Sequence, residues 1–117
     1  MRYVSVVNAT TGETLARHAA VAETVLSRFL GLQFRRELPA GEGLVLLPEN
    51  SIHMFFMFIR IDVVFVDQAS TVVHVGRSLR PWTVGPIVPH ALYCVELPEG
   101  AAARTEPGHA IELRKLA

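Results

Sequence analysis

Hydrophobic positions occur in short stretches along most of the chain, and the first of these stretches, residues 2–7, shows a weak strand-like alternation. Short apolar stretches, many of them rich in β-branched residues, are separated by turn residues at intervals of about 8–12 positions, which is typical of antiparallel β proteins. These stretches predict strands at residues 2–7, 14–18, 44–47, 52–59, 61–66, 71–75, 91–97 and 110–113. Residues 101–104 could form one helical turn, and residues 80–89 predict an irregular connection.

The period changes to that of a helix in one segment only. Apolar residues there are spaced three and four apart and form one helical face, at positions 21, 25, 26, 29, 30 and 32. Thr24 can supply an N-cap oxygen, with Ser27 as a second choice, and Gly31 stands where a helix would end. The pattern therefore predicts one short helix near residues 22–31.

Together these elements predict a mainly β (α+β) fold with seven or eight short strands and one helix. A compact antiparallel sandwich and an open barrel both fit this pattern. Strands and helices do not alternate, which argues against a parallel α/β sheet. The length of 117 residues predicts a single domain over residues 1–117.

Composition narrows the range of partners. Eleven basic and eleven acidic residues give zero net charge, which argues against nucleic-acid binding because phosphate backbones attract a surplus of positive charge. The longest apolar stretch, residues 52–66, contains Arg60 and Asp62 and is shorter than a membrane span of about 20 residues. Residues 1–8 lack the long apolar core of a secretion signal. We expect a cytoplasmic protein without membrane contact.

The potential metal ligands are dispersed. The single cysteine, Cys94, lies in an apolar strand, where a thiol is usually inert. Histidines at positions 53, 74, 90 and 109 do not have the close spacing of a zinc site. The sequence therefore predicts neither a metal site nor a cofactor.

Four segments resemble a prokaryotic family when they are taken in order. They are Thr24–Arg35, with Arg28, Gly31 and Leu32 at the matching positions; Glu42–Leu46 (EGLVL); Ser51–Asp67, which includes IDVVFVD; and Ala91–Gly100 (ALYCVELPEG). This order resembles the family called domain of unknown function 192, over about residues 4–113. The resemblance implies a small β-rich domain with an open, barrel-like sheet, and it implies no activity.

Several positions depart from the family pattern. Gln33 stands where methionine is usual, Arg60 where proline is usual, and His109 follows Gly108 where aspartate is usual. The lysine and asparagine of a W-M-K-N-T stretch are replaced in His53–Met57. If the family builds a polar site from those two residues, this chain lacks that site or uses His53 instead.

Asp62 is the first candidate for chemistry because it interrupts an apolar strand. A carboxylate in such surroundings must be paired or richly hydrogen-bonded. It could act as a general base, with His53 as a proton-transfer partner in a suitable strand register. Alternatively, Asp62 is structural and is held by backbone N–H groups or by an arginine.

Four further residues could bind a ligand. Arg28 and Arg35, seven residues apart, could clamp an anion, although either could instead pair internally or be solvated. Trp82 could line a ligand mouth or cover one end of the core. Glu96 lies in a predicted strand, either at an open end of the barrel or bonded to an arginine.

The run Met54–Phe58 is unusually rich in soft and aromatic residues. Strand alternation would place Met54, Phe56 and Phe58 on one face and Phe55 and Met57 on the other. We favour a central strand that is covered on both faces. The alternative is an exposed apolar patch for dimerisation or ligand binding.

The absence of a recognisable catalytic motif favours a non-enzymatic β domain that binds a small molecule or a protein partner. A homodimer is compatible with this reading. The alternative is a small enzyme that uses Asp62 with His53, or an Arg28/Arg35 anion clamp, for hydrolytic or proton-transfer chemistry. The sequence does not identify the ligand, the substrate or the biological process.

Overall fold

The computed structural model of the chain describes residues 2–116. Nine strands and one helix follow one another as β1 (Tyr3–Asn8), β2 (Glu13–Ala22), α1 (Val25–Leu30), β3 (Glu42–Leu46), β4 (Ser51–His53), β5 (Ile61–Val66), β6 (Val72–Leu79), β7 (Val84–Ile87), β8 (Tyr93–Pro98) and β9 (Ile111–Lys115). Seven strands form one sheet in the order β6-β5-β8-β3-β2-β1-β9, and β4 pairs with β7 in a separate small sheet.

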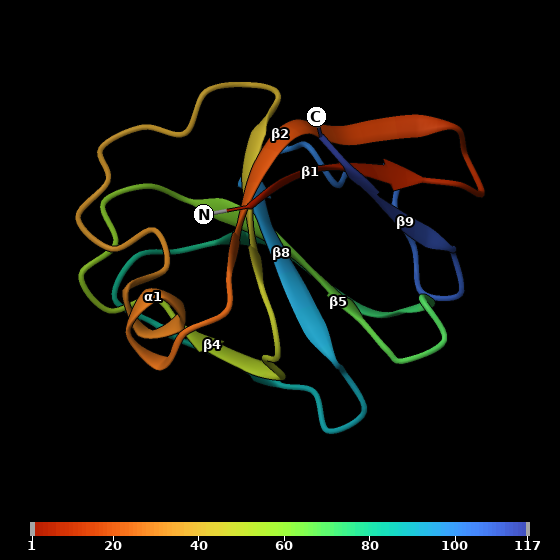
Figure 1. Cartoon of the computed structure of the whole chain (residues 1–117). Helices are drawn as coiled ribbons and strands as arrows, with labels where there is room; N and C mark the ends of the chain where they lie inside the picture. Colours follow the sequence, from red (N-terminus) through yellow and green to blue (C-terminus); the bar gives the residue numbers. More distant parts are fainter. Residues whose placement is uncertain (1, 117) are drawn as a thin grey trace.

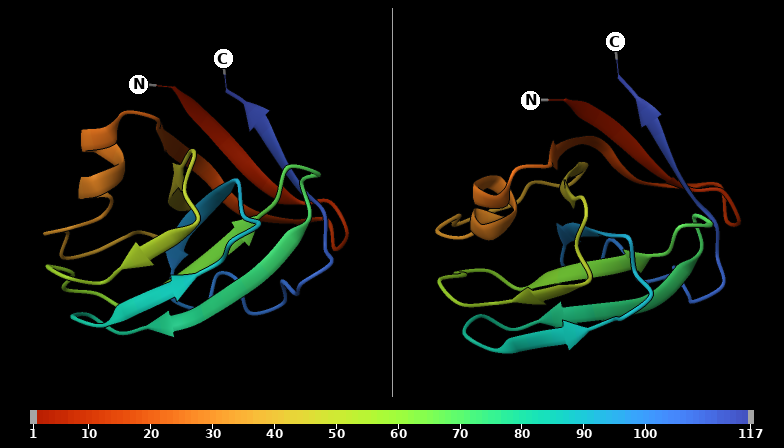
Figure 2. Two further views of the ribbon diagram at one scale, coloured as in Figure 1. Left: turned by 90° about the horizontal axis from the view of Figure 1, so that it is seen from below. Right: turned by 60° about the horizontal axis from the view of Figure 1, so that its bottom comes forward.

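The large sheet is curled into a half-barrel (Figures 1 and 2). An antiparallel bridge between Thr71 and Ala110 connects the segments that precede its two edge strands, β6 and β9. All strand pairs are antiparallel except β2 with β3. The prediction of a mainly β fold with an open barrel of short strands and one short helix is confirmed.

The central strands are covered on both faces. In β5, Val64 and Val66 belong to one buried cluster, and Val63 and Phe65 belong to a second cluster on the opposite face. This division follows from the two-residue period of a strand. The second cluster also contains Leu32, Met54 and Met57, which lie outside the large sheet, so the segments around α1 and β4 cover that face.

Helix α1 begins and ends where the sequence predicts. The Thr24 side chain accepts from the Ser27 N–H at 3.0 Å, Ser27 Oγ accepts from the Thr24 N–H at 3.1 Å, and Gly31 is the C-cap at a positive φ of 48°. The apolar face of the helix, however, is not buried. Val25, Leu26 and Phe29 are 77%, 66% and 62% exposed, because the helix lies at one end of the molecule beside β4 (Figure 1).

The prediction of a strand over residues 52–59 is wrong. The strand β4 ends at His53, and the following residues form turns with Phe56 at a positive φ of 61°. Met54 and Met57 are buried while Phe55, Phe56 and Phe58 are exposed, so the run is not a central strand and its phenylalanines lie at the surface. This segment also does not pair with β5, whose neighbours are β6 and β8. Residues 84–87, predicted as irregular, form β7 because they pair with β4.

Candidate functional site

Asp62 of β5 is held entirely by backbone groups. Its Oδ1 accepts from the Ser78 N–H at 2.9 Å, and its Oδ2 accepts from the Gly100 and Ala102 N–H groups at 3.0 and 2.9 Å. The carboxyl group is 1% exposed. Three N–H donors satisfy the carboxylate and connect β5 to β6 and to the turn after β8. These contacts describe a structural role for Asp62.

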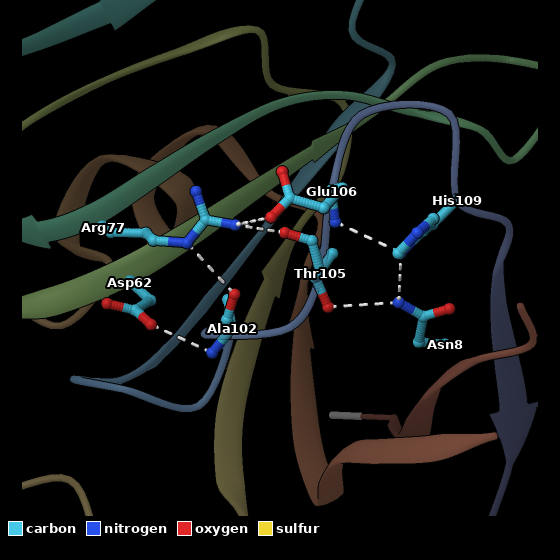
Figure 3. Close-up of polar contacts among 7 residues, drawn as sticks. All are labelled: Asn8, Asp62, Arg77, Ala102, Thr105, Glu106 and His109. Atoms are coloured by element: carbon cyan, nitrogen blue, oxygen red, sulfur yellow. Dashed lines mark hydrogen bonds and ion pairs between the residues drawn. The ribbon is translucent and has the colours of Figure 1, made fainter. Parts of the chain in front are cut away.

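A second network, made of hydrogen bonds and one ion pair, holds the turn after β8 in place (Figure 3). Arg77 donates to the carbonyl oxygens of Ala102, at 3.3 Å, and of Thr105, and it pairs with Glu106 at 3.2 Å. The buried Asn8 amide donates to Thr105 Oγ1 at 3.2 Å.

His109 completes this network. Its Nδ1 accepts from the Asn8 amide at 3.1 Å and from the Glu106 N–H at 3.2 Å (Figure 3). Within residues 2–116, no three His, Cys, Asp or Glu side chains are grouped so that they could hold a metal ion. The polar network therefore connects loops, and none of its contacts points to a ligand.

The candidate binding site is a pocket of about 310 Å³ beside α1. This volume lies at the lower end of the range for small-molecule sites. The walls come from α1 and the residues after it, from β3 and β8 of the large sheet, and from β4 and β7. Most of the lining is apolar, including Phe29, Leu30, Leu32, Leu46, Ile52, Met57, Val84 and Ile87.

Glu96 of β8 is the most unusual group in the pocket. Its side chain is 95% buried and makes no hydrogen bond in the part of the chain that the structure describes. Burial, followed by the charge of Glu49, raises the pKa of Glu96 to about 8. A Cβ atom at Gly31 would lie 3.0 Å from Glu96 Oε1, so the carboxyl group lies directly beneath the end of α1.

Arg28 and His53 lie in the same pocket. Arg28 Nη1 donates to the Pro48 carbonyl oxygen at 2.8 Å, while its Nε is buried and has no partner among residues 2–116. His53 Nδ1 accepts from the Phe55 N–H at 3.2 Å, and its ring centroid lies 6.0 Å from that of Phe29. Because the Asp62 hydrogen bonds all come from other residues, the structure does not bring His53 and Asp62 together as a hydrogen-bonded pair.

Arg35 and Trp82 lie outside the pocket. Arg35 is 3.9 Å from a carboxylate oxygen of Glu42, so it does not form an anion clamp with Arg28. Trp82 is 54% exposed and meets Phe56 edge-on at 5.0 Å between ring centroids. Of the ligand-binding candidates, the structure therefore brings together Arg28 and Glu96.

Sequence reasoning did not identify Glu49 as a site residue, and it identified Gly31 as the end of the helix but not as a wall of the pocket. Glu49 follows Pro48 in a turn, and nothing in that local pattern indicates proximity to β8. A weak signal was available for Glu96, because a glutamate between Val95 and Leu97 in a buried strand must meet either a partner or a cavity.

Comparisons with other proteins agree with this fold. The model of the family DUF192, described as uncharacterized ACR, matches residues 6–113. A UPF0127 protein of Thermococcus sibiricus is 35% identical over 98 residues, which are 80% of this chain and 63% of that protein. The chain thus spans less than two thirds of that relative. A UPF0127 protein of Pyrococcus furiosus is 32% identical over 93% of this chain and 97% of its own length.

A solved structure has the same architecture. The crystal structure of a protein of unknown function from Novosphingobium aromaticivorans superposes with a TM-score of 0.81 and 27% identity, over 94% of this chain and 83% of that one. Residues 2–116 contain no helix that is long and apolar enough to cross a membrane.

Proposed function

Because the chain belongs to the DUF192 family, which is uncharacterised, we propose a function from the geometry of the pocket: binding of a small molecule with an apolar body, without chemical conversion. A shared fold does not imply a shared function, so the proposal depends on this site alone. The observation that carries it is an apolar cavity of about 310 Å³ that contains a buried carboxyl group without a partner.

Buried polar groups in proteins are normally hydrogen-bonded, and an unpaired one costs free energy. The Arg28 Nε atom is buried without a partner within residues 2–116, and the Glu96 carboxyl group takes part in no side-chain hydrogen bond or ion pair there. Both residues line the cavity. A bound molecule with polar atoms at one end would satisfy such groups. The apolar lining would bury the remainder of that molecule.

The positions of the other reactive groups favour binding over catalysis. Asp62, the candidate general base, already accepts three backbone hydrogen bonds. Cys94 is fully buried, and burial raises the pKa of its thiol well above the usual range, which disfavours the nucleophilic thiolate.

Acid–base catalysis by Glu96 is a second candidate function. Its position favours it: Glu96 is buried in the wall of the pocket, and this burial raises its pKa to about 8, near the pH at which a group can both donate and accept a proton. Conversion of a bound compound into a product, abolished in Glu96→Gln, would support this candidate. Saturable binding without product supports the binding protein.

Methyl NMR tests the binding proposal directly. Met57 lines the pocket, whereas Met54 is equally buried but does not line it, so Met54 serves as an internal reference. We expect 1-hexanol to shift the Met57 methyl resonance with saturation and to shift that of Met54 less. Equal shifts at both methyl groups, or no saturable shift, would refute the proposal.

Two glycine variants provide a matched comparison. Gly31→Ala places a methyl group 3.0 Å from Glu96 Oε1, while Gly12→Ala, also at a positive φ, places one in open space. We expect Gly31→Ala to weaken hexanol binding severalfold and Gly12→Ala to leave it unchanged. Both variants place alanine at a positive φ, so binding is compared between the two proteins only after each is shown to be folded.

A further inference from the structure

We propose that the ligand of this pocket is a cation, a molecule with a protonated amine at one end and a short apolar body, and that Glu96 and Glu49 bind the amine. This inference rests on the proposed binding function and adds the chemical class of the ligand. It starts from two carboxyl groups that share one largely apolar cavity.

These two carboxyl groups have no cationic partner. Five ion pairs occur within residues 2–116, and they use the acids at positions 13, 23, 42, 106 and 112. Neither Glu49 nor Glu96 takes part in any of them. Arg28, the basic side chain in the pocket, donates to the Pro48 carbonyl oxygen instead.

In the empty pocket, a proton on Glu96 avoids the repulsion between two like charges in one desolvated space, and a bound cation can take the place of that proton. Glu96 is the stronger indication of a ligand because it is 95% buried, lines the cavity and accepts no hydrogen bond from the described chain. An ammonium group has three donors and no acceptor, which matches carboxylate oxygens that lack donors.

The charges in the pocket also favour a cation over an anion. The groups facing the cavity are Arg28, Glu49, His53 and Glu96, and β3 and β7 contribute no charged side chain to the lining. With Glu96 ionised and His53 neutral, Arg28 and one monovalent cation balance the two carboxylates. A carboxylate ligand would require a protonated Glu96 and would still face the charge of Glu49.

The size and the walls of the pocket limit the ligand. A cavity of about 310 Å³ holds about ten non-hydrogen atoms at the volume that liquid water occupies per molecule. The ring of Phe29 lines the same space and can contact a cation through its face. A short alkyl or cyclic amine therefore fits both the volume and the charge.

Binding would also release a proton. Below about pH 8, Glu96 of the empty protein is protonated, and contact with an ammonium group favours its carboxylate. The O–H bond of Glu96 then breaks and the proton passes to the buffer, while the amine keeps its own proton.

The test uses three probes that share a six-carbon chain and differ in their polar end group: hexylamine, 1-hexanol and hexanoate. Each probe is titrated into the protein at about pH 8, and binding is followed by the Met57 methyl resonance. We expect hexylamine to bind about tenfold more tightly than hexanol, and hexanoate to bind most weakly. Glu96→Gln and Glu49→Gln should each reduce the advantage of hexylamine and retain hexanol binding. Glu99→Gln, which changes an exposed acid next to β8, should change neither.

The outcomes separate the two proposals. Saturable binding of hexanol or hexanoate that is as tight as that of hexylamine overturns the cation and leaves the binding function intact. An advantage for hexylamine that survives in Glu96→Gln and Glu49→Gln also overturns the assignment. If none of the three probes binds, the proposed function itself fails.

A pH series adds a second readout. If hexylamine requires ionised Glu96, its affinity should rise on the order of 50-fold between about pH 6 and about pH 8, and hexanol should not follow. His53→Gln removes the imidazole that shares the pocket, and the rise should persist in that variant. A flat profile for hexylamine overturns the role of Glu96.

Discussion

The three hydrogen bonds to Asp62 make Asp62→Asn an informative substitution. The aspartate accepts from Ser78 on one oxygen and from Gly100 and Ala102 on the other. An asparagine can keep its carbonyl oxygen toward Gly100 and Ala102. Its amide nitrogen then faces the Ser78 N–H, so two donors meet and one hydrogen bond is lost.

The cost can be worked out from this geometry. An unsatisfied buried donor costs about 1–3 kcal/mol, and each of the two remaining bonds weakens by about 1 kcal/mol because its acceptor loses its charge. We expect Asp62→Asn to lower the free energy of unfolding by about 3–5 kcal/mol. For a chain of this size, the melting temperature should fall by roughly 10–15 °C.

Asp67→Asn is the matched control. Asp67 also accepts two backbone hydrogen bonds, from Ala69 and Thr71, but both reach the same oxygen, Oδ1, at 2.9 Å. An asparagine supplies that carbonyl oxygen unchanged, and the site lies in a turn at the surface. Water screens the loss of the carboxylate charge at this partly exposed turn, so we expect a loss of less than about 1 kcal/mol.

Urea denaturation of the wild type and both variants measures these differences. If Asp62→Asn and Asp67→Asn lose the same stability, within about 0.5 kcal/mol, the structural role of Asp62 is refuted. Asp62 does not line the pocket, so folded Asp62→Asn should still bind hexanol with the affinity of the wild type. A loss of binding by the folded variant would indicate that Asp62 takes part in ligand binding.

Three further predictions concern other parts of the chain. The folded protein holds the Glu96 proton up to about pH 8, whereas the unfolded chain loses it near the ordinary value of 4.5. The free energy of unfolding should therefore fall by about 1.4 kcal/mol for each unit that the pH rises between these values. Glu96→Gln should flatten this slope in urea denaturation, and an unchanged slope would contradict the assignment. Thr24→Ala removes the N-cap of α1 and should cost about 1 kcal/mol, measured by thermal unfolding; a cost equal to zero would mean that the cap does not stabilise the fold. Cys94 is buried with a raised thiol pKa, so a thiol reagent should modify it only when the chain unfolds, and rapid modification of the native protein would show that β8 opens.

Local sequence patterns predicted most elements because their causes are local. The apolar run at residues 61–66 is the fully buried strand β5, and Thr24 and Gly31 bound α1 as their capping chemistry predicts. The prediction was wrong at residues 54–58, where the hydrophobic run indicated a strand covered on both faces. The backbone turns there instead, with Phe56 at a positive φ, and three phenylalanines remain exposed.

The candidate site was less accessible to sequence reasoning. Arg28, His53 and Glu96 were candidates and share the pocket, but the pairs expected to act together, Asp62 with His53 and Arg28 with Arg35, are not brought together. A pairing between distant side chains depends on strand order and register, and neither can be read from the period of one strand.

By itself, the sequence determined a mainly β chain with one short capped helix, because turn residues, β-branched runs and caps act over a few positions. Only the tertiary structure decided what the buried carboxylates do. Asp62 and Glu96 are both acids in apolar strands, and β5 and β8 are neighbours in the sheet. Asp62 meets three N–H donors and becomes structural, while Glu96 on β8 meets a cavity and the charge of Glu49. The fate of a buried charge depends on which groups the fold places around it, and those groups come from distant parts of the chain.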